Sequence, residues 1–121
     1  MIDYKKYNVW QKSHNLVLEI YKVTATFPKS ELFNLVSQMN RASVSIPTNI
    51  AEGCGRETQK ELMRYLYISS GSAHELEYLL LVSKDLKFIN ENSYIKLYAE
   101  INEIKMMLAA LIRKIAQTVN H

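Results

Sequence analysis

A proline inside a helical pattern is the feature that most constrains this sequence. One side of residues 38–56 carries small and polar residues at helical spacing: Ala42, Ser45, Asn49 and Glu52. A neighbouring side carries Met39, Ile46 and Ile50. Pro47 lies within this pattern, where a proline removes one backbone hydrogen bond and costs ~3 kcal/mol. We therefore expect this segment to pack closely against another helix or another subunit, because such packing offsets the cost.

The composition favours a few long helices. The chain has 121 residues, which predicts a single domain over residues 1–121, and only three glycines and two prolines interrupt it. An all-β domain needs many more turns than these residues provide. The hydrophobic share of 48% and the charged share of 22% are those of an ordinary folded domain, not of a disordered chain.

Hydrophobic periodicity predicts an all-α fold, an up-down-up-down four-helix bundle. The expected helices span about residues 8–26, 31–53, 58–86 and 93–118. Residues 27–28, Phe-Pro, end the first helix, and Ser30 is expected to cap the second. Gly53 is expected to close the second helix in the left-handed conformation, and Thr58 with Glu61 forms a capping box for the third.

Packing expectations follow from the same pattern. Pro47 should bend the second helix, and Ser43 and Ser45 can take up the backbone group that it frees. The small residues 69–73 should pack against the small side of the second helix. The fourth helix carries a seam of apolar residues, namely Ile101, Ile104, Leu108, Leu111 and Ile115. Ala109, Ile112 and Ala116 widen this seam, so we expect spare apolar surface and an oligomer. Residues 119–121 are expected to fray.

Residues 45–53, SIPTNIAEG, followed closely by Gly55 and Arg56, resemble the signature of the bacterial four-helix bundle proteins. These are often called intervening-sequence proteins, because some are encoded inside insertions in large-subunit ribosomal RNA genes. Three flanking features agree with the family: VWQK at residues 9–12, Phe-Pro at 27–28, and Gly71-Ser72 with Glu75-Leu76. The resemblance covers about residues 8–90.

The resemblance implies a small four-helix bundle that assembles as a homopentameric barrel. A related branch, the accessory variability determinants of diversity-generating retroelements, forms similar barrels and binds nucleic acid and a reverse transcriptase through basic surface. The formal net charge of this chain is only +3, which is modest beside that strongly basic branch. The helix-packing and oligomer motif that the resemblance implies comprises Ser45, Pro47, Asn49, Glu52, Gly53, Gly71 and Ser72.

Arg56, Lys60 and Arg64 follow one another at four-residue spacing and predict a basic ridge at the start of the third helix. Arg41 joins this ridge if the helical hairpin brings it close. Such a ridge can neutralise the phosphates of RNA or DNA. The simpler interpretation, which we favour, is a solvated helix face on which Glu57 and Glu61 pair with the basic residues, because charges of mixed sign are usual there.

Other candidate sites are weaker. Asn49 and Glu52 are expected to form a polar network that sets helix register or an interface. Cys54, His14 and His74 lack the short ligand pairs of a zinc site and have no reason to meet as nucleophile and base. Residues 53–55 lack the Lys-Ser/Thr of a phosphate-binding loop, and residues 74–78 do not match the zinc-protease motif. We expect no metal, no cofactor and no enzymatic activity.

Two functions remain from the sequence. The first is a non-enzymatic scaffold that oligomerises with itself, as a pentamer. The second is a nucleic-acid-binding accessory protein that presents the basic ridge on such an oligomer. No stretch approaches the ~20 apolar residues of a membrane span, no secretory signal is recognisable, and the single cysteine fits a reducing compartment, so we expect a cytoplasmic protein without a membrane partner.

Overall fold

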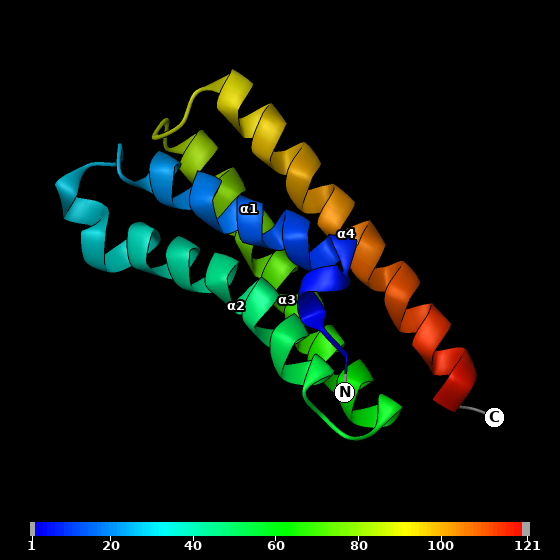
Figure 1. Cartoon of the computed structure of the whole chain (residues 1–121). Coiled ribbons are helices and arrows are strands. Elements are labelled where there is room, and N and C mark those ends of the chain that lie inside the picture. Colours follow the sequence, from blue (N-terminus) through cyan, green and yellow to red (C-terminus); the bar gives the residue numbers. More distant parts are fainter. Residues whose placement is uncertain (1, 120–121) are drawn as a thin grey trace.

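Four long helices run side by side in the computed structural model, which describes residues 2–119 (Figure 1). They are α1 (Asn8–Thr24), α2 (Ser37–Cys54), α3 (Gln59–Asp85) and α4 (Glu91–Val119). Short helical turns precede α1 and α2, namely η1 (Tyr4–Lys6), η2 (Lys29–Glu31) and η3 (Leu32–Val36). No strand occurs in this part of the chain. The predicted fraying at the C-terminus falls largely on residues 120 and 121, outside the described residues.

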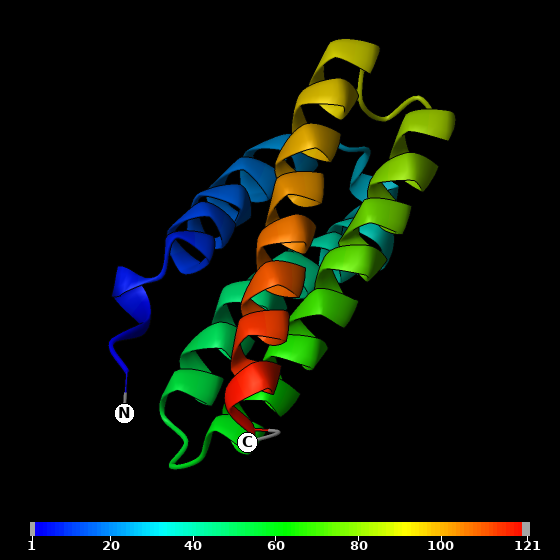
Figure 2. The same cartoon turned by 90° about the vertical axis from the view of Figure 1, so that its right-hand side faces the viewer.

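The helices alternate in direction, which confirms the predicted up-down-up-down bundle. Figure 2 shows the α1–α2 and α3–α4 connections at one end, and the α2–α3 connection at the other end with η1 and the end of α4. Consecutive helices pack against each other, and α1 closes the bundle against α4. The bundle therefore has an α1–α2 side and an α3–α4 side.

The core consists of aliphatic side chains at helical spacing. The largest fully buried ones include Leu16, Ile20, Met39, Ile46, Ile50, Leu66, Leu76, Leu80, Ile101, Ile104 and Leu108. The predicted seam of α4 is largely confirmed, although Leu111 is only partly buried. Ile112, expected on spare surface, is 7% exposed and belongs to the core. Its position follows from α4 packing on both α3 and α1, which gives the helix a wider buried side than a two-helix seam needs.

The α1–α2 connection differs from the prediction. Phe27 is buried and Pro28 follows α1, as expected, but Ser30 does not cap α2, because it lies inside η2. The chain next makes a π-type turn, in which Asn34 has the non-helical angles φ −122° and ψ −109°. Regular α-helix begins only at Ser37. Backbone angles this far from helical values separate the entry turn from α2, so Ser30, seven residues before Ser37, has no helix start to cap.

Helix α2 continues through the buried Pro47. Because proline has no N–H, the Ser43 carbonyl loses its usual donor, and the hydroxyls of Ser43 and Ser45 do not replace that donor as expected. The Ser43 hydroxyl donates to the Asn40 carbonyl at 2.9 Å, and the Ser45 hydroxyl pairs with that of Ser72 at 2.7 Å. Both hydroxyls are therefore engaged elsewhere, because serine in a helix bonds readily to a preceding carbonyl or across a close helix contact.

Gly53 does not close α2 in a left-handed conformation. The helix runs on to Cys54, and no glycine among residues 2–119 has a positive φ. Instead, a Cβ at Gly53 would lie 2.9 Å from Leu62 Cδ1 and 2.9 Å from Tyr65 Cβ. Because Gly53 has no side chain, α3 can approach α2 closely at this position. The glycine is therefore needed for helix packing and not, as predicted, for ending α2.

The ends of α3 are set by local chemistry. Thr58 caps the helix as predicted, because its hydroxyl accepts from the Glu61 backbone N–H at 3.1 Å. At the other end Lys87 has φ 66°, and the Phe88 N–H donates to the Ser83 carbonyl at 2.9 Å. This is the six-to-one hydrogen bond of a Schellman motif, in which lysine occupies the position that usually holds glycine.

Candidate functional site

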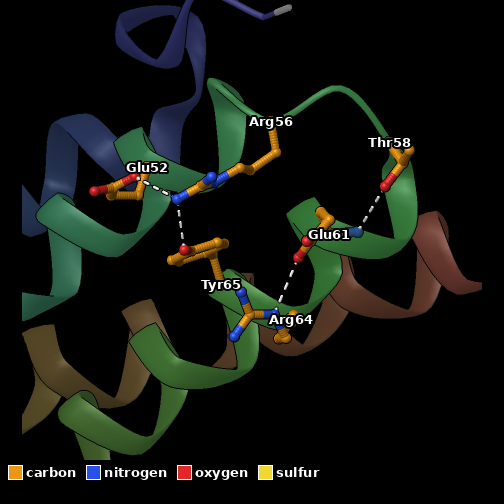
Figure 3. Close-up of polar contacts among 6 residues, drawn as sticks. All are labelled: Glu52, Arg56, Thr58, Glu61, Arg64 and Tyr65. Carbon is orange, nitrogen blue, oxygen red and sulfur yellow. Dashed lines mark hydrogen bonds and ion pairs between the residues drawn. The ribbon is translucent and has the colours of Figure 1, made fainter.

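The basic residues at the α2–α3 connection surround one tyrosine (Figure 3). Arg56 donates to the Tyr65 hydroxyl at 2.7 Å and pairs with the Glu52 carboxylate at 3.3 Å. The guanidinium carbons of Arg56 and Arg64 lie 4.9 and 4.8 Å from the centre of the Tyr65 ring. Cations at this distance are attracted to an aromatic ring. In the structure, the arginines of the predicted ridge form a cluster around Tyr65, a residue that their spacing alone did not indicate.

Acidic side chains partly neutralise this cluster. Arg64 pairs with Glu61 at 3.0 Å, and this hydrogen bond is the main cause that raises the pKa of Arg64. Arg56 pairs with Glu52 rather than with Glu57. Lys60 and Arg64 border a hollow of about 500 Å³, with Met63 and Tyr67 among its lining residues. Of the two acidic residues predicted to pair with the ridge, Glu61 does so and Glu57 does not among the described ion pairs. The exposed ring of Tyr67 lies beside the ridge, so both interpretations of it keep a structural basis.

Arg41 does not join the cluster. Arg41 is exposed on α2, and about 20 Å of helix lies between it and the end of α2, which precedes Arg56. Its neighbour Met39 is level with Ser83, since the Ser83 hydroxyl contacts the Met39 sulfur at 3.3 Å. Arg64 lies near the opposite end of α3. The antiparallel hairpin that we expected to unite these residues holds them apart.

The residues of the predicted packing motif do not act as one unit. Ser45, Ser72 and Asn49 form the contact between α2 and α3: Asn49 Nδ2 donates to the Ser45 carbonyl at 2.8 Å and to its hydroxyl at 2.9 Å. Glu52 lies outside this network and is exposed. Pro47 faces the α1 side, where it lines a hollow. The small residues of α3 pack on α2 as predicted, because the Ser69 hydroxyl donates to the Ile46 carbonyl at 2.9 Å.

Gly71 is the exception among the small residues. A Cβ at this position would meet no heavy atom within 4 Å. Gly71 therefore serves no close contact within the chain, unlike Gly53. Around it, α3 exposes two tyrosines: Tyr67 is 59% exposed and Tyr78 is 64% exposed.

Exposed apolar side chains also occur on other elements. Phe33 in the π-type turn is 92% exposed, and Met106 on α4 is 65% exposed. Between α1 and α2, one hollow of about 480 Å³ and another of about 270 Å³ are lined mainly by apolar and aromatic residues. Helical periodicity finds the buried side of each helix but does not rank its exposed sides, so these features were not predicted.

A charged cavity of about 360 Å³ lies between α1 and α4. Lys12 and Glu103 bridge it at 2.9 Å, and Glu100 lines it. Burial is the largest cause that raises the pKa of Glu100 from its ordinary value of 4.5. The Lys96 ammonium opposes this shift, and the Glu19 carboxylate adds to it. The carboxylate of Glu100 is thus held in an environment that disfavours its charge.

Cys54 and the histidines remain apart. Cys54 is 2% exposed, and burial raises the pKa of its thiol, which lowers its reactivity. His74 Nδ1 lies 2.8 Å from the Ser70 carbonyl, and His14 stacks on Trp10 at 5.2 Å. Over residues 2–119, no group of three or more candidate ligands could hold a metal ion, and no helix is long and apolar enough to cross a membrane.

Comparison with protein families gives a decisive match. The family model of the 23S rRNA-intervening sequence protein matches residues 5–110. The chain belongs to this family. The resemblance inferred from residues 45–53 is thereby confirmed, and it extends beyond the predicted range into α4. No curated protein matches the chain.

A solved structure supports the fold of this intervening-sequence protein. It is the crystal structure of a protein with unknown function from the S23 ribosomal protein family of Bacteroides thetaiotaomicron. The two chains are 24% identical, with a TM-score of 0.81, and the match covers 87% of this chain and 95% of the other. This likeness shows the fold alone. Neither comparison indicates an enzyme family.

Proposed function

We propose that this intervening-sequence protein is a non-enzymatic scaffold that assembles with itself as a homopentamer. The observation that carries the proposal is the amount of apolar and aromatic surface that a lone chain leaves exposed, chiefly Tyr67, Tyr78 and Met106. Such surface favours a protein partner, because its burial releases ordered water. The number five follows the family resemblance, and a cytoplasmic location stays a prediction from the sequence.

Light scattering coupled to size-exclusion chromatography tests this proposal. The chain has a mass of 14.1 kDa, so the proposal predicts a particle five times heavier that dissociates on dilution. A particle of 14.1 kDa at every concentration up to the millimolar range would remove the basis for a scaffold.

A second candidate function is binding of single-stranded nucleic acid at the α2–α3 connection. The cluster of Arg56, Lys60 and Arg64 favours it. Arg56 and Arg64 lie over the ring of Tyr65, and Lys60 and Arg64 border the hollow that the exposed Tyr67 also lines. Cations that contact phosphates beside rings that stack on bases are the usual features of such sites. Glu52 and Glu61 oppose it, since each already pairs with one arginine.

A salt titration with labelled single-stranded RNA and DNA tests this second function. Binding should weaken as salt rises, and Lys60→Ala with Arg64→Ala should flatten the dependence of affinity on salt. Lys22→Ala, an exposed site in the last turn of α1 at the opposite end of the bundle, serves as the control and should leave the dependence unchanged. Absence of binding at 20 mM salt, or equal loss in the control, would exclude a role for this cluster.

A further inference from the structure

The cavity between α1 and α4 is lined by charged side chains from two facing helices. On α1 these are Lys12 and Glu19, and on α4 they are Lys96, Glu100 and Glu103. Their spacing of three, four or seven residues places each set along one side of its helix. The volume of about 360 Å³ lies within the range of about 300–1,000 Å³ that is usual for small-molecule sites. Ligand sites in helix bundles are commonly built in this way, from side chains on facing helices.

The floor of this cavity is apolar. Leu16 of α1 and Ile104 of α4 line it, and each is only 1% exposed because it belongs to the core. Asn15, which is exposed on α1, adds an amide that can donate and accept hydrogen bonds. The cavity thus combines an apolar floor with charged walls. A ligand that fits it needs a small apolar part as well as charged groups.

Two of the five charged groups take part in none of the ion pairs within residues 2–119. Lys12 pairs with Glu103 at 2.9 Å, and Glu19 pairs at 3.5 Å with a lysine one turn further along α1. Lys96 and Glu100 remain, one helical turn apart on α4, and none of the ion pairs in this part of the chain includes either of them. The cavity therefore offers one ammonium group and one carboxylate group to a ligand.

The positive charge around Glu100 is not sufficient to keep its carboxyl at its ordinary pKa. Burial is the largest cause that raises the pKa of Glu100, and the carboxylates of Glu19 and Glu103 raise it further. The ammonium groups of Lys96 and Lys12 lower this pKa but do not outweigh the other causes. An additional ammonium group inside the cavity would therefore stabilise the charged form of Glu100.

The mixture of charges limits which ligands fit. A divalent metal ion is disfavoured, because two lysines line the cavity and residues 2–119 contain no group of three or more potential ligands that could hold one. A phosphate or a dicarboxylate is disfavoured by the three glutamates. A molecule with one ammonium group and one carboxylate group pairs with both remaining side chains and adds no net charge. An α-amino acid has these two groups on one carbon atom.

We propose that the cavity between α1 and α4 binds a free α-amino acid with an aliphatic side chain. The ammonium group of the ligand pairs with Glu100, its carboxylate pairs with Lys96, and its side chain packs on Leu16 and Ile104. Such a ligand joins α1 to α4, which pack on each other less extensively than the consecutive helices do. Binding should therefore stabilise the fold. The site lies within one chain and does not depend on the proposed self-assembly.

Titration with L-leucine, followed by NMR of the backbone amides, tests the site. Leucine should produce saturable shifts in the residues that line the cavity and should raise Tm. Two analogues each lack one charge: 3-methylbutylamine lacks the carboxylate, and 4-methylpentanoate lacks the ammonium group. Each should bind about tenfold more weakly or worse, because one charged side chain of the site is left unpaired. The proposal is wrong if leucine causes no saturable shift at millimolar concentrations, or if either analogue binds as tightly as leucine does.

Substitutions at the two unpaired groups locate the ligand. Glu100→Gln and Lys96→Gln each remove one charge and should weaken leucine binding about tenfold or more, with an unchanged circular dichroism spectrum. Glu91→Gln removes a charge from an exposed position of α4 outside the cavity, so it is the matched control and should bind leucine as the unsubstituted chain does. Equal affinity in all three variants would place leucine elsewhere and refute the site.

The pH dependence of leucine binding gives a second measurement. Leucine affinity should fall as pH drops through the raised pKa of Glu100, because a neutral carboxyl no longer attracts the ammonium group. Glu100→Gln should remove this dependence, and Glu91→Gln should retain it. An affinity in the unsubstituted chain that does not change over this pH range would contradict the assigned role of Glu100.

Discussion

Alanine at two glycines should change stability in opposite directions. Gly53 and Gly71 both lie inside helices, so alanine at either position gains up to ~1 kcal/mol of helix propensity. At Gly71 nothing lies within 4 Å of the new methyl group. Gly71→Ala should therefore stabilise the chain by about 0.5–1 kcal/mol.

At Gly53 the new methyl group has no room. It would lie 2.9 Å from Leu62 Cδ1, 2.9 Å from Tyr65 Cβ and 3.2 Å from the Leu62 carbonyl oxygen. The Leu62 methyl can rotate, but the backbone oxygen and the Tyr65 Cβ move only if α3 shifts. Overpacking of this kind costs about 1–3 kcal/mol. Because Gly53 is next to the last residue of α2, its propensity gain is small, and we expect a net loss of about 1–2 kcal/mol.

Thermal unfolding followed by circular dichroism measures both changes. In a chain of this length 1 kcal/mol corresponds to about 4 °C in Tm. We expect Gly53→Ala to lower Tm by about 4–8 °C and Gly71→Ala to raise it by about 2–4 °C. The scans use one low concentration at which the chain is dissociated, so that assembly does not contribute. A stabilising Gly53→Ala would refute the close α2–α3 approach.

Four further outcomes follow from local contacts. Thr58→Ala should cost about 1 kcal/mol in urea unfolding, since it removes the cap of α3, and an unchanged midpoint would refute the cap. Lys87→Gly should stabilise by about 1 kcal/mol in the same assay, because glycine adopts the left-handed conformation without strain, and a lower midpoint would contradict this. Burial raises the pKa of Glu100, so folding favours its protonated form, and the free energy of unfolding should increase as pH falls through the raised pKa. Glu100→Gln should abolish this increase. In a double-mutant cycle, Ser45→Ala and Ser72→Ala should show a coupling of about 1 kcal/mol, and additivity would exclude their hydrogen bond.

Local patterns predicted the fold well because helices depend on short-range chemistry. The apolar spacing of α4 and the threonine cap of α3 act within a few residues, and the structure confirms both. Predictions failed where a residue has two physical uses. Gly53 can end a helix or admit another one, and only the position of Leu62 and Tyr65 decides between them. The entry to α2 failed for a similar reason, since Asn34 breaks the helix without proline or glycine nearby to indicate it.

The candidate surfaces were less predictable than the core. The spacing of Arg56, Lys60 and Arg64 indicated their common face, but their meeting around Tyr65 depends on how α2 packs on α3. Arg41 carries the same charge and lies far from them, which linear spacing could not exclude. The exposure of Tyr67 and Tyr78 on α3 was not predicted, because an exposed tyrosine and a half-buried one have the same sequence pattern, and only the packed structure distinguishes them.

Native mass spectrometry of the unsubstituted chain tests the central claim most directly. The claim is that the chain leaves apolar surface for other copies of itself. The account predicts one dominant species that contains five copies of the 14.1 kDa chain and loses one copy at a time on collisional activation. A spectrum that contains only the 14.1 kDa chain, under conditions that keep it helical, would contradict the account.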